Sequence, residues 1–175
     1  PAPDSSNTLQ ETITATQTAA ASLQQTGFHA AAARILRATA LRHITKAPHD
    51  LEELVAQASE AASQDTAILV QTQVLRTAAL LARLQGRTAG GVAAAQAASE
   101  KAHAAGAPAL AVAATIDAAR ALAESLAGRD EAIACLGRAA EAASSLGRPD
   151  LTALADLETA SIFRQDGWLD EAHAF

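Results

Sequence analysis

The sequence predicts an all-α fold, an α–α superhelix of about four antiparallel helical hairpins. Three observations predict it. The first is composition, since 50 of the 175 residues are alanine and only 2% are aromatic. Alanine is the best helix former, whereas β-sandwiches and barrels need β-branched and aromatic residues on their pleated faces. The second is an internal repeat of about 41 residues. The third is the regular placement of glycine between stretches of helical pattern.

The repeat is visible in columns of apolar residues that keep the 41-residue spacing. Four such columns are Leu69, Leu110 and Leu151; Leu75, Ile116 and Leu157; Leu54, Ala95 and Leu136; and Ala61, Ala102 and Ala143. A unit of two helices cannot bury its own apolar face, but stacked copies can. The interval therefore predicts a superhelix in which one helix of each pair lines a concave side.

Glycine and aspartate mark the ends of the helices in the first half of the chain. Gly27 ends one helix, and Asp50 and Asp65 stand near helix starts, where a carboxylate meets free N–H groups. The first helix has the weakest support, because threonine and glutamine lower its propensity. Four helices are expected here, at 5–26, 28–46, 50–63 and 66–86.

The second half follows the same rules. One class of turn carries Gly106 or Gly147, each followed by a proline that suits a first helical turn. The other class carries Gly86, Gly128 or Gly167. The helices expected are 88–105, 108–127, 130–146 and 149–166, with another beginning near 168.

Charge and cysteine content limit the partners and the compartment. A net charge of −6 argues against a nucleic-acid surface, which would show clustered lysine and arginine. The longest charge-free stretch is interrupted by polar residues, so no membrane span is expected. A single cysteine cannot form an internal disulfide, and a cytoplasmic location is expected.

No catalytic or metal site is expected. Cys135 lies between Ile133 and Leu136, in the pattern of a small hydrophobe that fills a helix contact. The five histidines show no pair four residues apart and no cysteine partner, so a zinc site is not expected. We expect no enzyme activity and no cofactor.

Part of the repeat resembles the tetratricopeptide (TPR) family. The resemblance rests on the segment 121–132, ALAESLAGRDEA, followed by Ala139, Ala142 and Pro149. The unit is longer than the family's repeat of about 34 residues, and leucine and alanine fill its bulky aromatic positions. A HEAT-like repeat is the structural alternative. Long alanine-rich units of this kind are similar to the TPR-like regions of large bacterial LuxR-type transcriptional activators. That resemblance implies a sensor arm that binds an inducer or a partner protein, while separate domains bind ATP and DNA.

The repeat predicts a polar groove on the concave side. Stacking at the repeat interval brings equivalent positions together, with a basic half beside an acidic half. The candidate binding residues are Arg34, Arg76, Arg83, Asp117, Arg120, Glu124 and Glu158. The alternative is a solvated face with weak ion pairs.

The aromatic residues Phe163, Trp168 and Phe175 gather near the end of the sequence. We expect them to pack together and against a further hairpin, or to form an apolar end through which the chain dimerises. The final residues read as a helix just begun, so residues 1–175 are expected to be one domain from a longer protein.

The predicted function is a binding module that recognises a protein, a peptide or a small inducer. One alternative is a passive scaffold that joins proteins and senses nothing. Another is an enzyme or the effector pocket of a one-domain repressor, which requires a convergent cluster of titratable residues.

Overall fold

A computed structural model describes residues 5–175 of the chain, so residues 1–4 of the predicted domain lie outside the described residues. The described part contains nine α-helices and two short 3₁₀ turns, and no strand. The α-helices are α1 (Ser5–Gln25), α2 (His29–His43), α3 (Glu52–Ser63), α4 (Ile68–Leu84), α5 (Thr88–Ala104), α6 (Pro108–Ala123), α7 (Arg129–Ser145), α8 (Pro149–Gln165) and α9 (Leu169–Ala172). The 3₁₀ turns are Pro48–Leu51 before α3 and Leu126–Gly128 before α7.

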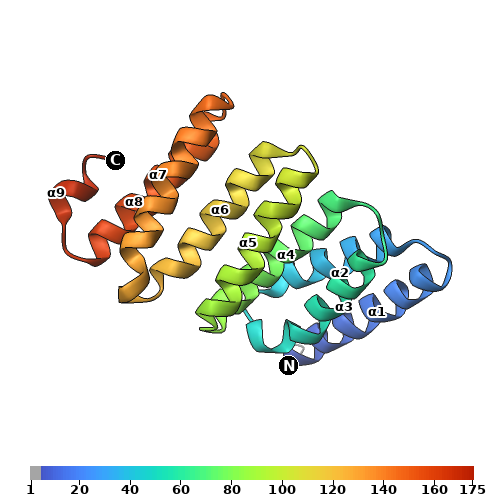
Figure 1. The fold of residues 1–175 in the computed structure, drawn as a ribbon. Helices are drawn as coiled ribbons and strands as arrows, with labels where there is room; N and C mark the ends of the chain where they lie inside the picture. The colour runs from blue at the N-terminus through green and yellow to red at the C-terminus, as the bar shows by residue number, and fades with distance from the viewer. Residues whose placement is uncertain (1–4) are drawn as a thin grey trace.

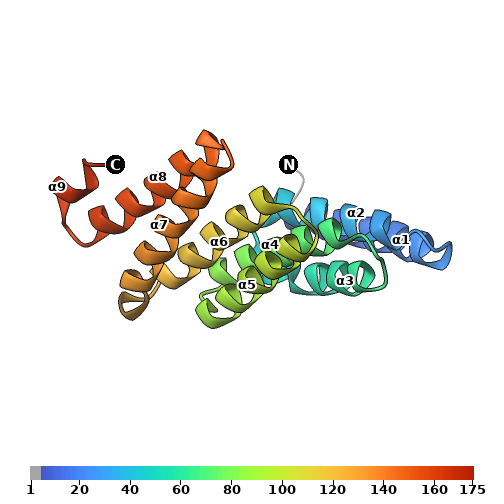
Figure 2. The ribbon, with the colours of Figure 1, turned by 45° about the horizontal axis from the view of Figure 1, so that its top comes forward.

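Each helix packs against the next one in the chain, which confirms the predicted all-α superhelix of helical hairpins. Figures 1 and 2 show the helices following one another from α1 at one end to α9 at the other. The most extensive contacts join α4 to α5 and α5 to α6. Alanine and glycine make this packing possible, because Gly91, Ala95, Ala98 and Ala102 of α5 are all buried.

One side of the row of helices is packed more tightly than the other. Each of α2, α4 and α6 also contacts its next-but-one neighbour, α4, α6 and α8 respectively. Among the odd-numbered helices within residues 5–175, α1 and α3 make a weaker contact of this kind, whereas α3 and α5 make none, and neither do α5 and α7. The side on which alternate helices approach one another is the inside of a curve. The even-numbered helices therefore line the concave face, as the repeat predicts.

Two of the predicted columns form the core of successive repeats. Leu54, Ala95 and Leu136 are at most 1% exposed, and Ala61, Ala102 and Ala143 are fully buried. These residues lie on α3, α5 and α7. Equivalent positions on the odd-numbered helices therefore occupy equivalent environments.

The column Leu75, Ile116 and Leu157 differs in burial along the chain. Ile116 is fully buried beside Ala132 and Leu136 of α7, whereas Leu157 is 64% exposed. Ile116 faces α7, the next helix in the chain, so the equivalent residue Leu157 is expected to face α9. Because α9 has only four residues, it leaves this side of α8 uncovered.

The predicted glycine turns are confirmed at five of six positions. Gly27, Gly86, Gly106, Gly147 and Gly167 have positive φ angles between 63° and 82°. At Gly86 the Arg87 N–H donates to the Ala82 carbonyl at 2.8 Å, and the Gly86 N–H donates to Arg83 at 2.9 Å. This pattern closes a helix with a left-handed residue, which glycine adopts at little cost.

Gly128 differs from the other turn glycines. Its φ is −94°, and its N–H donates to the Ser125 hydroxyl at 3.2 Å. A Cβ at this position would collide with the carbonyl oxygen of Leu122. Gly128 is therefore required by a close approach of the backbone and not by a left-handed turn. The predicted helix 108–127 ends earlier, at Ala123, and the 3₁₀ turn Leu126–Gly128 follows it.

Asp65 accepts hydrogen bonds at the starts of two helices, whereas the sequence predicted a role at one helix start only. One carboxylate oxygen accepts from the Ala67 N–H at 2.8 Å, just before α4. The other accepts from the Ala30 N–H at 2.9 Å, in the first turn of α2. A single carboxylate thus satisfies N–H groups that a helix leaves without an internal partner.

None of the described helices is long and apolar enough to cross a membrane.

Candidate functional site

Charged side chains of the concave face form ion pairs between neighbouring even-numbered helices. Arg76 Nε of α4 donates to Asp117 Oδ2 of α6 at 2.6 Å. Arg83 Nη1 of α4 donates to Glu124 Oε1, just past the end of α6, at 3.0 Å. In both pairs the residues are 41 positions apart in the sequence. The repeat interval therefore predicts which charged residues face each other.

The network continues to the last long helix. Arg120 Nη2 donates to Glu158 Oε1 of α8 at 2.7 Å, and Arg120 Nη1 lies 3.4 Å from Asp117 Oδ1. Burial acts to lower the pKa of Arg120, but its hydrogen bond with Glu158 and the charges of Glu158 and Asp117 raise it overall. Asp117 accepts from both Arg76 and Arg120, so a single carboxylate is shared by two guanidinium groups.

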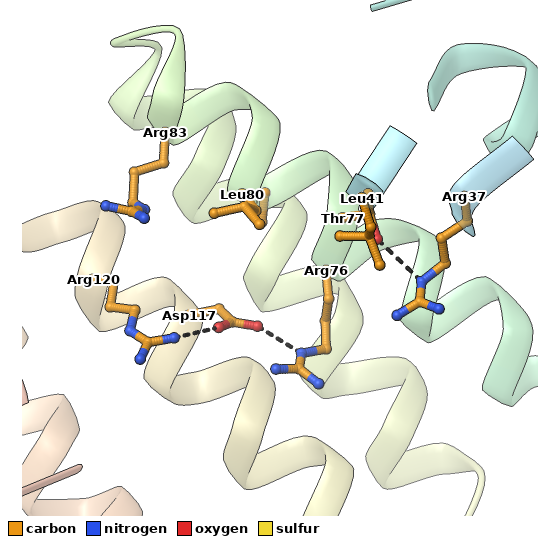
Figure 3. Close-up of a pocket in the computed structure, with 9 residues that line it drawn as sticks. Arg37, Leu41, Arg76, Thr77, Leu80, Arg83, Asp117 and Arg120 are labelled. Atoms are coloured by element: carbon orange, nitrogen blue, oxygen red, sulfur yellow. Dashed lines mark hydrogen bonds and ion pairs between the residues drawn. The ribbon is translucent and has the colours of Figure 1, made fainter. Parts of the chain in front are cut away.

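A pocket of about 220 Å³ opens between α2, α4 and α6 on this face. Figure 3 shows its side chains. Arg76, Arg83 and Arg120 contribute guanidinium groups and Asp117 a carboxylate. Leu80 adds an apolar wall. The pocket thus combines apolar surface with several positive charges.

A second pocket of about 170 Å³ lies beside the first, towards α8. Arg83 and Arg120 line both pockets, so the two pockets are neighbours along one groove. Glu124 and Glu158 line only the second pocket. The groove is therefore basic at its α2–α4 end and carries its glutamates at the α6–α8 end.

Arg37 of α2 lines the first pocket and was not among the residues predicted from the sequence. Its Nε donates to the Gln73 carbonyl and to the Thr77 hydroxyl, each at 3.1 Å. Burial, and then repulsion from Arg76, lower the pKa of Arg37. The guanidinium is still charged at neutral pH. Arg37 thus adds a fourth cation to the basic end.

The structure brings six of the seven predicted binding residues together. Arg76, Arg83, Asp117, Arg120, Glu124 and Glu158 all line the groove formed by the two pockets. Arg34 is exposed on α2 and lines neither pocket. The repeat predicted that Arg34 would line this end of the groove. Arg37, one turn further along α2, lines it instead.

Other reactive side chains lie apart from the groove. Cys135 is partly buried on α7, and Arg138 Nη2 lies 3.0 Å from its sulfur. Residues 5–175 contain no group of three histidine, cysteine or acidic side chains placed to hold a metal ion.

The aromatic residues near the end of the sequence form one cluster. Phe163 stacks on Trp168 with ring centroids 5.9 Å apart, and Phe175 lies 5.8 Å from Phe163. Trp168 and Phe175 are 55% and 59% exposed. The rings pack together as expected, and their outer surface is open. Dimerisation through this surface remains a prediction.

The stacked helical hairpins and the polar concave groove describe a fold and a surface, and a fold alone does not define a function. No protein-family model, curated protein or solved structure matches the sequence. The resemblance to TPR and LuxR-type proteins therefore remains a prediction.

Proposed function

We propose that the protein is a non-enzymatic, TPR-like binding module whose concave groove recognises a small inducer or a partner protein. It would serve as the sensor region of a bacterial LuxR-type transcriptional regulator. The observation that supports a binding activity most strongly is the convergence of charged side chains from α2, α4, α6 and α8 around two adjoining pockets.

The arrangement of charge in the groove would bind a ligand in one orientation. A ligand with a negative group and a neutral or positive group would align with the basic and acidic ends. Arg76, Asp117, Arg120 and Glu158 are between 18% and 30% exposed, so solvent screens them less than charges on an open surface. Their network also holds the side chains in place before a ligand arrives, which lowers the entropic cost of binding.

A passive scaffold is the competing function, and a thermal-shift screen separates the two. The protein is heated in the presence of sugars, small metabolites and peptides. A ligand at 100 times its dissociation constant should stabilise the fold by about 2.7 kcal/mol. A sensor gives such a shift with a small molecule, whereas a screen without any stabilising small molecule favours the scaffold.

Charge reversal in the groove locates the binding surface. The double variant R76E/R83E should lose ligand binding while circular dichroism shows that its helices remain. Arg138 of α7 lines neither pocket, so R138E is the matched control and should bind as the unaltered protein does. Equal affinity in R76E/R83E and the unaltered protein would exclude the groove as the binding site.

The regulatory role has its own test. The coding sequence on either side of this region should specify a phosphate-binding loop and a helix-turn-helix DNA-binding domain. Flanking sequence that encodes neither would contradict a LuxR-type regulator without affecting the proposed binding activity.

A further inference from the structure

The basic end of the groove holds more guanidinium groups than carboxylates. Arg83 is paired with Glu124, Arg120 is paired with Glu158, and Arg76 is paired with Asp117. Arg37 is the fourth cation of the pocket, and its hydrogen bonds to described residues go to a carbonyl and a hydroxyl oxygen, both neutral. Four guanidinium groups thus share three carboxylates, which leaves one positive charge without a counter-charge in the network.

The side chain of Arg37 is fixed in a position where its remaining donors are available. Its Nε is held by Gln73 and Thr77, whereas no described residue accepts a hydrogen bond from its two Nη groups. In Figure 3 the guanidinium groups of Arg37 and Arg76 lie on the same side of the pocket but apart from each other, and that of Arg76 is turned towards Asp117. The lowered pKa of Arg37 reflects burial and repulsion from Arg76. A negative group between the two guanidinium groups would relieve this repulsion.

We infer that Arg37 and Arg76 form a binding site for the oxyanion of a small molecule, either a carboxylate or a phosphoryl group. This inference rests on the proposed function and names the ligand class of the same groove. Guanidinium groups match both oxyanions because their N–H donors form a planar fork. The pocket volume of about 220 Å³ and the side chains of Leu41 and Leu80 suit a small organic acid or phosphate monoester with a short apolar part.

Isothermal titration calorimetry tests the site with inorganic phosphate and with succinate as probes. Sodium chloride at the same ionic strength controls for screening of the charges. We expect heat of binding for phosphate, for succinate or for both, and none for chloride. Phosphate alone would assign the site to a phosphoryl group, and succinate alone to a carboxylate.

Variants at Arg37 connect the binding to the residue. R37Q should lower the affinity for the oxyanion about tenfold or more, because a hydrogen bond to a charged group is lost. R37K keeps the charge but not the planar fork and should give an intermediate affinity. R138Q, which removes an arginine outside the groove, should bind as the unaltered protein does. Thermal denaturation checks that each variant is folded.

A measurement on the unaltered protein keeps the test independent of folding in the variants. The Nε–H signal of Arg37 in a ¹H–¹⁵N NMR spectrum should shift during the titration with the oxyanion. No binding of either probe, or equal affinity in R37Q and the unaltered protein, would overturn the inference. If a neutral sugar or peptide binds the groove equally well in R37Q while neither oxyanion binds, this inference fails and the proposed function stands.

Discussion

Truncation of two residues at the same position of the repeat should have very unequal effects on stability. Ile116 and Leu157 are 41 residues apart, and I116A and L157A each remove most of an aliphatic side chain. Ile116 is fully buried, whereas Leu157 is 64% exposed. Loss of a buried aliphatic side chain costs about 2–5 kcal/mol, and the cost depends on how far the neighbours move into the cavity.

The neighbours of Ile116 place its loss in the upper part of that range. Ala119, Ala132 and Ala139 belong to the same buried cluster, and alanine side chains are too short to fill the space. We therefore expect I116A to lower the free energy of unfolding by about 3–5 kcal/mol. L157A should change it by less than about 0.5 kcal/mol, as is usual for a surface substitution.

Urea denaturation followed by circular dichroism measures both effects. The two variants are compared with the unaltered protein at one concentration, so that any self-association is the same in each. A loss of stability in L157A as large as that in I116A would show that α8 is covered on both sides. A loss below about 1 kcal/mol in I116A would contradict the packing of α6 against α7.

The remaining predictions concern a turn, an ion pair, a terminal surface and a carboxyl group. G128A should destabilise the fold, because its Cβ would collide with a backbone oxygen, whereas G137A, where a Cβ meets nothing within 4 Å, should be neutral or stabilising in urea denaturation. The charge swap R76D/D117R should restore part of the stability lost in R76D alone, and additive losses would contradict the pair. Sedimentation at several concentrations should show dimers that W168A weakens, and a strict monomer would exclude an associating apolar end. Hydrogen bonds from Arg148 lower the pKa of Asp150, so the carboxyl contributes stability above its ordinary pKa and loses it as the pH falls through the lowered value. R148Q should raise the Asp150 pKa in an NMR titration, and an unchanged value would contradict the pair.

The helices, and six of the residues that line the groove, could be predicted from the sequence because the sequence repeats at a fixed interval. Glycines that adopt positive φ mark helix ends directly, as at Gly106 and Gly147. A repeat that stacks at a fixed interval also predicts contacts between residues far apart in the sequence. For this reason the pairing of Arg76 with Asp117, and of Arg83 with Glu124, could be predicted without coordinates.

Features that depend on local deviation from the repeat could not be predicted. Arg37 is outside the column of charged residues, since the residue 41 positions later is Ala78. Its role follows from its hydrogen bonds to Gln73 and Thr77 of the neighbouring helix, which no spacing rule identifies. Gly128 occupies the same kind of place in the sequence as Gly86, but only the path of the backbone after α6 shows that it packs against Leu122.

The central claim is that ligands bind the concave face of the even-numbered helices. The most direct test is a ¹H–¹⁵N NMR titration of the protein with a ligand found by thermal shift. The shifted signals should belong to α2, α4, α6 and α8, with the Nε–H groups of Arg37 and Arg76 among the largest changes. Shifts confined to α3, α5 and α7 would place binding on the opposite face and contradict the claim.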